Sequence, residues 1–314
     1  MSKAKVDLVT GFLGAGKTTF IKKLLHYYRN HSQQAIVIEN EFGKAGIDTA
    51  MLKEEQFDVT SLAGGCICCG LKVNFHNLLI ELSEHYDRII VEPSGIYTLE
   101  DFYDIMESPS IAEHCTVGSI LMIVDPKQLE ELDEESEKIV YSQLAGAGKV
   151  LISKTGVQNV DADLVTHRLQ DILEAHDNKD RDVLTYTVFQ DWETFTEADY
   201  QSFQDCGYYR NRHNLPKQDH ASLFFNTTIA PVFQNLSEME PFIREALSGI
   251  WGEIIRIKGY LKCTDGNFYN INCTPHDWNI KTVSSDSDTP DIKSGINLIG
   301  RSIDRAAIKK RLEK

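Results

Sequence analysis

Residues 11–18 carry the clearest chemical pattern in this sequence. Gly11-Phe12-Leu13-Gly14-Ala15-Gly16-Lys17-Thr18 fits G-x-x-x-x-G-K-[ST], directly after an apolar run and directly before a helical one. In such a loop the backbone amides and the start of a helix surround phosphate groups, the lysine neutralises β- and γ-phosphate oxygens, and the hydroxyl binds Mg²⁺. The pattern therefore predicts a nucleotide-phosphate site whose members are Gly11, Gly14, Ala15, Gly16, Lys17, Thr18 and Thr19.

A second candidate element is the apolar run Arg88–Val91, which ends in Glu92 and is followed by Pro93-Ser94-Gly95. A carboxylate at the end of a strand beside a phosphate loop can hold Mg²⁺ through a water molecule, and Gly95 lets the backbone approach the γ-phosphate. An ordinary turn after a strand is the alternative. We expect catalysis by positioning and charge neutralisation, with Lys17, Thr18 and Glu92 as the catalytic residues.

Three thiols lie within four residues in Gly64-Gly65-Cys66-Ile67-Cys68-Cys69-Gly70. As thiolates they can bind a soft or borderline cation such as Zn²⁺ or Cu⁺. A tetrahedral zinc site would lack one ligand, which suits loading and release. Buried structural thiols and a redox pair are the alternatives. The other four cysteines are interpreted as small buried side chains: Cys115, Cys206, Cys263 and Cys273.

Two further segments are candidates for contact with a nucleotide or a metal. Glu39 ends the apolar run Ala35–Glu39 and begins the acidic stretch Glu39-Asn40-Glu41-Phe42-Gly43, so it is a candidate ligand for Mg²⁺ or for the thiol-bound metal. A solvated turn is the alternative. Ser153 and Lys154 follow another apolar run, where a GTPase has the lysine that lies along its base. The aspartate that accepts hydrogen bonds from guanine in such motifs is replaced by Gly156, which predicts a weakened preference for GTP over ATP.

The apolar runs and helical stretches between these residues predict the elements that position them. The runs are rich in Ile and Val and lack polar alternation, which is typical of a mostly parallel sheet covered on both faces. The predicted strands are Val6–Phe12, Ala35–Glu39, Asp58–Leu62, Arg88–Val91, Ser119–Val124, Lys149–Ser153 and Val183–Val188. The predicted helices are Thr18–Arg29, Val73–Tyr86, Glu134–Leu144 and Asp163–Ala175.

The element order changes in the last third of the chain, which predicts a second, smaller α+β domain. Its predicted strands are His220–Thr227, Glu253–Leu261, Asn267–Asn272 and Ile296–Ile303, and its predicted helices are Glu238–Leu247 and Asp304–Leu312. A hairpin turn is predicted at Thr264-Asp265-Gly266-Asn267 and an acidic loop at Ser284–Asp291. We expect an α/β domain of the P-loop NTPase type over residues 1–205, a linker over 206–219 and the C-terminal domain over 220–314.

Composition limits the classes of partner. The 314 residues carry a net charge of −15, which argues against nucleic acid or an anionic membrane as a partner. No apolar run approaches the roughly 18 residues that a membrane-spanning helix needs. Seven cysteines, three of them clustered, suit a reducing cytoplasm better than a disulfide framework. These properties predict a cytoplasmic globular protein.

Taken together, the motifs resemble the CobW-like family of metallochaperone GTPases. The matching segments are Gly11–Thr19, Glu39–Gly43, Gly65–Cys69 and Glu92–Gly95, in the same order and at similar spacing. The stretch from about residue 219 resembles the family's second domain. Lys44 and Gly156 depart from the pattern, the first standing where many members carry a second acidic residue.

The resemblance implies hydrolysis of GTP, with Mg²⁺, coupled to delivery of a transition metal to a client metalloprotein. Zinc is the metal most often implied, and cobalt or nickel are possible. The partners would then be GTP, GDP and the client. A metal-buffering or sensing module that uses the nucleotide only as a conformational ligand is the main alternative, and a small-molecule kinase is a third.

Overall fold

The structure is a computed structural model that describes residues 3–40, 52, 55–62, 72–156, 160–210, 225–283 and 294–313. The described residues form two compact units, the first ending at residue 210 and the second beginning at residue 225. Glu41–Gly43, Lys44, the Cys66–Cys69 cluster and the Ser284–Asp291 loop lie outside the described residues. Among the described residues, no helix is long and apolar enough to cross a membrane.

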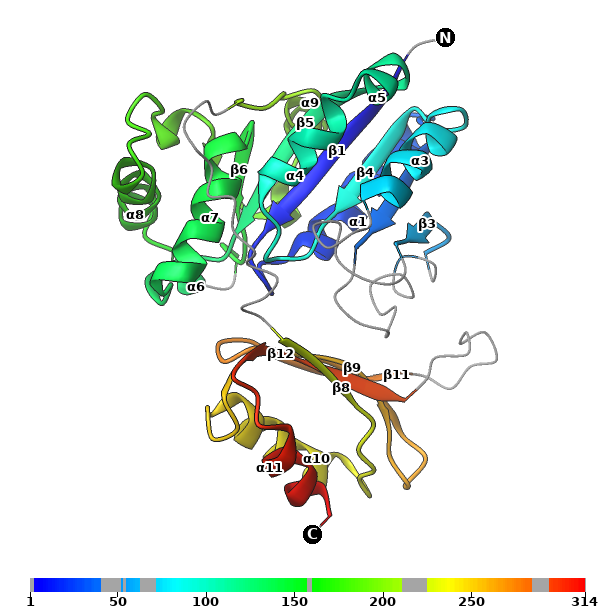
Figure 1. Ribbon diagram of the computed structural model, residues 1–314, viewed down its shortest axis with the longest axis vertical. Helices are drawn as coiled ribbons and strands as arrows, with labels where there is room; N and C mark the ends of the chain where they lie inside the picture. Colours follow the sequence, from blue (N-terminus) through cyan, green and yellow to red (C-terminus); the bar gives the residue numbers. More distant parts are fainter. Residues whose placement is uncertain are drawn as a thin grey trace. The chain divides into compact units, whose positions relative to one another are not determined.

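The first unit is built on a seven-stranded parallel sheet with the order β3-β2-β4-β1-β5-β6-β7. All of its strands therefore end at the same edge, where the loops that carry the candidate site begin (Figure 1). The strands are β1 (Ala4–Gly11), β2 (Ala35–Glu39), β3 (Asp58–Ser61), β4 (Arg88–Glu92), β5 (Cys115–Val124), β6 (Lys149–Ile152) and β7 (Thr187–Val188).

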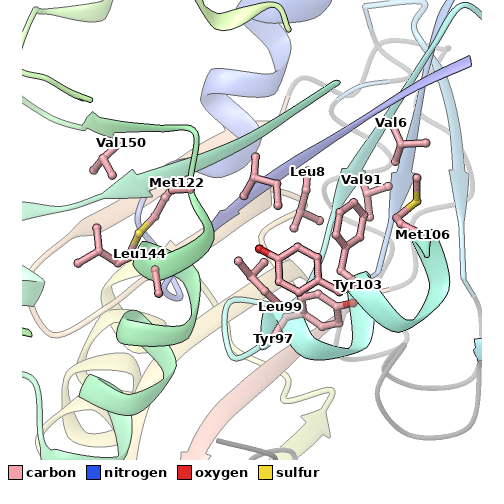
Figure 2. Packing of buried hydrophobic residues seen from close by; sticks show 14 of the residues in the cluster. Val6, Leu8, Val91, Tyr97, Leu99, Tyr103, Met106, Met122, Leu144 and Val150 are labelled. Carbon is pink, nitrogen blue, oxygen red and sulfur yellow. The ribbon is translucent and has the colours of Figure 1, made fainter. Parts of the chain in front are cut away.

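Helices cover both faces of this sheet. The helices are α1 (Lys17–Asn30), α3 (Lys72–Ser83), α4 (Leu99–Met106), α5 (Pro109–His114), α6 (Pro126–Glu130), α7 (Glu134–Gly146), α8 (Ala162–Ala175) and α9 (Glu197–Phe203), with the 3₁₀ turns η2 (Val183–Thr185) and η3 (Trp192–Thr194). One apolar layer joins the sheet to α3, α4, α7 and α8, and the other joins it to α1 and α9. Figure 2 shows the first layer, in which Leu8 of β1 and Val91 of β4 lie near Tyr103 of α4.

A buried ion pair ties the central strands together. Arg88 at the start of β4 donates from Nη1 to both carboxylate oxygens of Asp7 on β1, at 3.0 and 2.9 Å. Tyr28 of α1 donates its hydroxyl to Asp7 Oδ2 at 3.1 Å, and Arg88 also reaches Asp205 at 3.1 Å. Because Asp7 and Arg88 are 0% and 3% exposed, loss of either partner leaves a buried charge, which is strongly destabilising.

The second unit is a five-stranded antiparallel sheet with the order β11-β10-β9-β12-β8. Its elements are β8 (Phe225–Ile229), α10 (Leu236–Leu247), β9 (Glu253–Lys262), β10 (Phe268–Cys273), β11 (Trp278–Val283), β12 (Gly295–Arg301) and α11 (Arg305–Leu312). Apolar side chains of α10, such as Phe242 and Ile243, pack with Ile257 and Leu298 of the sheet, and Ile308 of α11 belongs to the same core. This is the smaller α+β domain that the sequence predicts.

Most predicted elements are confirmed, with three informative differences. The predicted strand Val183–Val188 is wrong in its first half, because Asp182 accepts a hydrogen bond from the Leu184 amide and bends that stretch into η2. The short helices α4, α5, α6 and α9 were not predicted, since 5 to 8 residues show too little periodicity. The strand β11 was also missed, because it is a half-exposed strand at the edge of its sheet.

Candidate functional site

The loop between β1 and α1 has the conformation that its glycines predict. Gly16 is the N-cap of α1 and has φ 107°, in the left-handed region that a side chain rarely adopts. Gly14 also has positive φ, at 82°, and the Ala15 amide donates to the Phe12 carbonyl oxygen within the loop. The loop thus places the first turn of α1 at the sheet edge. Thr19 lies in that turn and is exposed.

Lys17 is folded against the loop that contains it. Its side chain is almost fully buried, and its Nζ donates to the carbonyl oxygens of Gly11 at 2.9 Å and Phe12 at 3.2 Å. The ammonium group is therefore held within the loop, at the start of α1. A cation in this position can neutralise phosphate oxygens that the loop amides bind.

Thr18 and Glu92 meet although they are far apart in the sequence. The Thr18 hydroxyl donates to Glu92 Oε1 at 3.0 Å. The contact arises because β1 and β4 are neighbours in the sheet, Thr18 follows the loop after β1, and Glu92 is the last residue of β4. A hydroxyl and a carboxylate are the oxygen ligands that Mg²⁺ prefers, so this pair fits a magnesium site.

The turn after β4 packs directly against the phosphate loop at Gly95. A Cβ atom added to Gly95 would lie 2.5 Å from the Leu13 amide nitrogen and 2.8 Å from its Cα. Only glycine therefore allows this approach of the two backbones. This close contact brings the Gly95 backbone to the predicted phosphate site.

Glu39 lies next to Glu92 at the same edge. The two residues are paired in register between β2 and β4, and Glu39 is 2% exposed. Backbone hydrogen bonds extend the arrangement beyond the strands, from the Asn40 amide to the Glu92 carbonyl at 2.9 Å and from the Leu62 amide to the Glu39 carbonyl at 3.0 Å. The stretch that leads to residues 41–51 thus leaves the sheet beside Glu92, and the stretch that leads to the cysteine cluster leaves it one strand further away, beside Glu39.

Ser153 and Lys154 lie after β6, on the other side of the phosphate loop. The Ser153 hydroxyl donates to the Val124 carbonyl at 3.2 Å, while Lys154 has φ 60° and its Nζ donates to Asp125 Oδ2 at 2.7 Å. Asp125 is a residue that the sequence reasoning missed. The sequence did contain a signal for Asp125, the same one that was used for Glu92: a carboxylate at the end of a central apolar run.

The described cysteines match their prediction in three cases of four. Cys115, Cys263 and Cys273 are buried, whereas Cys206 is partly exposed. Within the described residues, no group of three or more His, Cys, Asp or Glu side chains is placed to hold a metal ion. Cys66, Cys68 and Cys69 are outside that part of the chain, so their role as ligands stays a prediction.

Family models match the chain in two stretches. Residues 5–181 match the CobW/HypB/UreG nucleotide-binding domain, and residues 230–314 match the C-terminal domain of the cobalamin synthesis protein CobW. The chain belongs to the CobW/HypB/UreG family. The first match contains the phosphate loop, Glu39, the cysteine cluster, Glu92 and Lys154.

Curated relatives carry zinc in their names. The zinc chaperone CobW of Pseudomonas aeruginosa is 32% identical over 195 residues, 52% of this chain and 52% of the relative. The zinc chaperone YeiR of Escherichia coli is 32% identical over 48% of this chain and 46% of its own length. The chain thus spans about half the length of these relatives. The zinc-regulated GTPase metalloprotein activator 1 of Schizosaccharomyces pombe is 22% identical over 96% of this chain and 83% of its own length.

Among solved structures, Zn(II)-bound YjiA GTPase from E. coli matches over the full length of both chains, with 18% identity and a TM-score of 0.40.

Proposed function

We propose that this chain is a GTP-hydrolysing metallochaperone that binds zinc at Cys66, Cys68 and Cys69 and couples its nucleotide state to delivery of the metal to a client protein. The observation that carries the nucleotide half is the 3.0 Å contact between Thr18 and Glu92, which joins the phosphate loop to the end of β4. The names of the curated relatives support zinc as the cargo, with cobalt and nickel as further candidates.

Each residue of the nucleotide site has a distinct task in hydrolysis. The loop amides and the start of α1 bind phosphate oxygens, and Lys17 offsets charge on the β- and γ-phosphates. Thr18 and Glu92 would hold Mg²⁺, which supplies further charge neutralisation when bound. The backbone at Gly95 lies close enough to the loop to contact a γ-phosphate and to sense its loss.

The sheet edge provides a short route from nucleotide to metal. Cys66 comes four positions after Leu62, whose amide donates to the Glu39 carbonyl. Four extended residues span at most about 14 Å. Glu39 is itself paired with Glu92 across β2 and β4. A movement of the Glu92–Gly95 turn on loss of the γ-phosphate would therefore act on the strand ends that lead to the thiols.

Zinc titrations in two nucleotide states test the coupling. Zinc affinity is measured with competing chelators, once with GDP and once with a non-hydrolysable GTP analogue, both with Mg²⁺. We expect the two affinities to differ by about 5- to 150-fold, the usual range for coupled sites. Cys68→Ser should lower both affinities, whereas Cys206→Ser, at a partly exposed thiol outside the cluster, should not. Identical affinities in the two states would instead favour the buffering module.

Hydrolysis is tested separately with Lys17→Ala, which removes the cation of the phosphate loop. We expect GTP turnover to be lost while the protein keeps its folded circular dichroism spectrum. Lys22→Ala is the control, because Lys22 lies on the same helix but pairs with Glu55 at 2.7 Å. Turnover by Lys17→Ala at the wild-type rate would overturn the assignment of this loop as the active site.

A further inference from the structure

Gly156 lies against the carboxylate of a distant residue, Asp191. A Cβ atom added to Gly156 would be 2.3 Å from Asp191 Oδ2, 2.8 Å from its Cγ and 3.1 Å from Oδ1. Within an aspartate, each carboxylate oxygen lies about 2.4 Å from its own Cβ, as bond lengths of about 1.5 and 1.2 Å dictate. Asp191 therefore places an oxygen within the reach that an aspartate side chain at position 156 would have.

Local contacts fix the position of Asp191. It follows β7, which pairs with β6, the strand that leads to Lys154 and Gly156. Asp191 is also the N-cap of η3, where Oδ1 accepts from the Glu193 amide at 3.1 Å. The capping bond uses Oδ1, and Oδ2 is the oxygen nearer to Gly156.

Trp192 anchors the same turn to the phosphate loop. Its indole ring lies 3.5 Å from the Cβ position of Gly16, which is also 3.8 Å from the Ser153 Cβ. The ring packs edge-on against Phe20 of α1, with 5.5 Å between centroids. The turn that carries Asp191 and the loop that carries Ser153 thus converge on Gly16, the N-cap of α1.

We propose that Asp191 recognises the guanine base, as the substitute for the carboxylate absent from Gly156. This inference rests on the nucleotide site proposed above. Guanine presents two donors on one edge, N1–H and the N2 amino group, and a carboxylate accepts from both. Adenine has an acceptor at N1 and no amino group at C2, so Asp191 disfavours it. The chain keeps a preference for guanine despite Gly156, in contrast to the expectation from the sequence.

Asp191→Asn tests this proposal by changing the hydrogen-bonding partner without removing the cap, since asparagine is also a good N-cap. Affinities for GDP, ADP and xanthosine diphosphate, in which a carbonyl replaces the 2-amino group, are measured calorimetrically with Mg²⁺. We expect wild type to prefer GDP over ADP. In Asp191→Asn, GDP affinity should fall by about 5- to 150-fold, the range for a bidentate base contact, while affinity for xanthosine diphosphate should rise.

The chain offers a closely matched control in Asp182→Asn. Asp182 caps η2 as Asp191 caps η3, and its side chain accepts from the Leu184 amide at 3.0 Å. In each of the two turns, a threonine hydroxyl also donates to the backbone carbonyl of the capping aspartate at 2.7 Å. Asp182→Asn should leave all three affinities unchanged. A rescue variant, Asp191→Ala combined with Gly156→Asp, moves the carboxylate from position 191 to position 156. It should recover the GDP preference that Asp191→Ala alone loses.

The outcomes separate the two proposals. Failure of wild type to bind any nucleotide would refute the proposed function, and the inference with it. Equal wild-type affinity for GDP and ADP, or wild-type GDP affinity in Asp191→Asn, would overturn the inference and leave the nucleotide site intact. If Asp191→Asn does not fold, the rescue variant decides, since GDP preference there supports a carboxylate at this position and its absence refutes it.

Discussion

Gly95→Ala tests how closely the turn after β4 and the phosphate loop must fit. The added methyl group would lie 2.5 Å from the Leu13 nitrogen, 2.8 Å from its Cα and 2.9 Å from its Cγ. Ordinary contact between such atoms begins at about 3.5 Å, so one of the two backbones must move by about 1 Å. Two of the three contacted atoms are backbone, and a rotamer change cannot relieve those clashes.

The expected losses of stability and of GDP affinity follow from the displacement of the phosphate loop. Overpacking of a tight site costs about 1–3 kcal/mol of stability. A loop displaced by about 1 Å also loses at least one amide hydrogen bond to a charged phosphate, which contributes about 1.5–3 kcal/mol. We therefore expect GDP affinity to fall by about 10- to 150-fold in a protein that still folds.

The assay is calorimetric titration with GDP, alongside urea unfolding monitored by circular dichroism. Gly295→Ala is the matched control, because among the described residues a Cβ there meets only the Ile229 carbonyl oxygen, at 3.5 Å, and its backbone is not left-handed. That variant should bind GDP as wild type does. GDP binding by Gly95→Ala within a factor of two of wild type would show that the approach of the two backbones does not matter for the nucleotide.

Two further predictions concern stability and thiol chemistry. Arg88→Leu should lower the free energy of unfolding by about 3–5 kcal/mol, because it leaves the buried Asp7 carboxyl without its ionic partner. Lys5→Ala should cost under about 1 kcal/mol, because the Lys5 pair with Asp205 is partly exposed and 3.6 Å long. Comparable losses in urea unfolding would contradict this ranking. Burial raises the pKa of the Cys115 thiol to about 11, so at pH 8 only about 0.1% is thiolate. Labelling with a maleimide, mapped by peptide mass, should reach Cys115 only after unfolding, and rapid labelling of the native protein would refute this.

Sequence reasoning was most successful where a local pattern and its chemistry coincide. The phosphate loop, its flanking strand and helix, and the placement of Glu92 at a strand end follow from spacing and periodicity. Each needs only a few neighbouring residues to specify it. The family resemblance, carried by those same motifs, is confirmed by the family models.

The order of the strands in the sheet could not be predicted from local sequence patterns. That β4 lies between β1 and β2 brings Thr18 to Glu92 and Glu92 to Glu39, and this depends on packing of the whole sheet. The prediction for Val183–Val188 failed in its first half for a related reason, since one hydrogen bond from the Leu184 amide to the Asp182 side chain outweighed the apolar pattern.

The sequence by itself determined that this protein has a phosphate loop, a nearby carboxylate and a cluster of thiols, because each is encoded in adjacent residues. It indicated that the guanine-binding carboxylate was missing, because Gly156 has no side chain. Only the tertiary structure placed the carboxylate of Asp191, 35 residues further along the chain, beside Gly156. Parallel pairing of β6 and β7 brings the loops after both strands to one edge, and no pattern within either loop specifies that meeting.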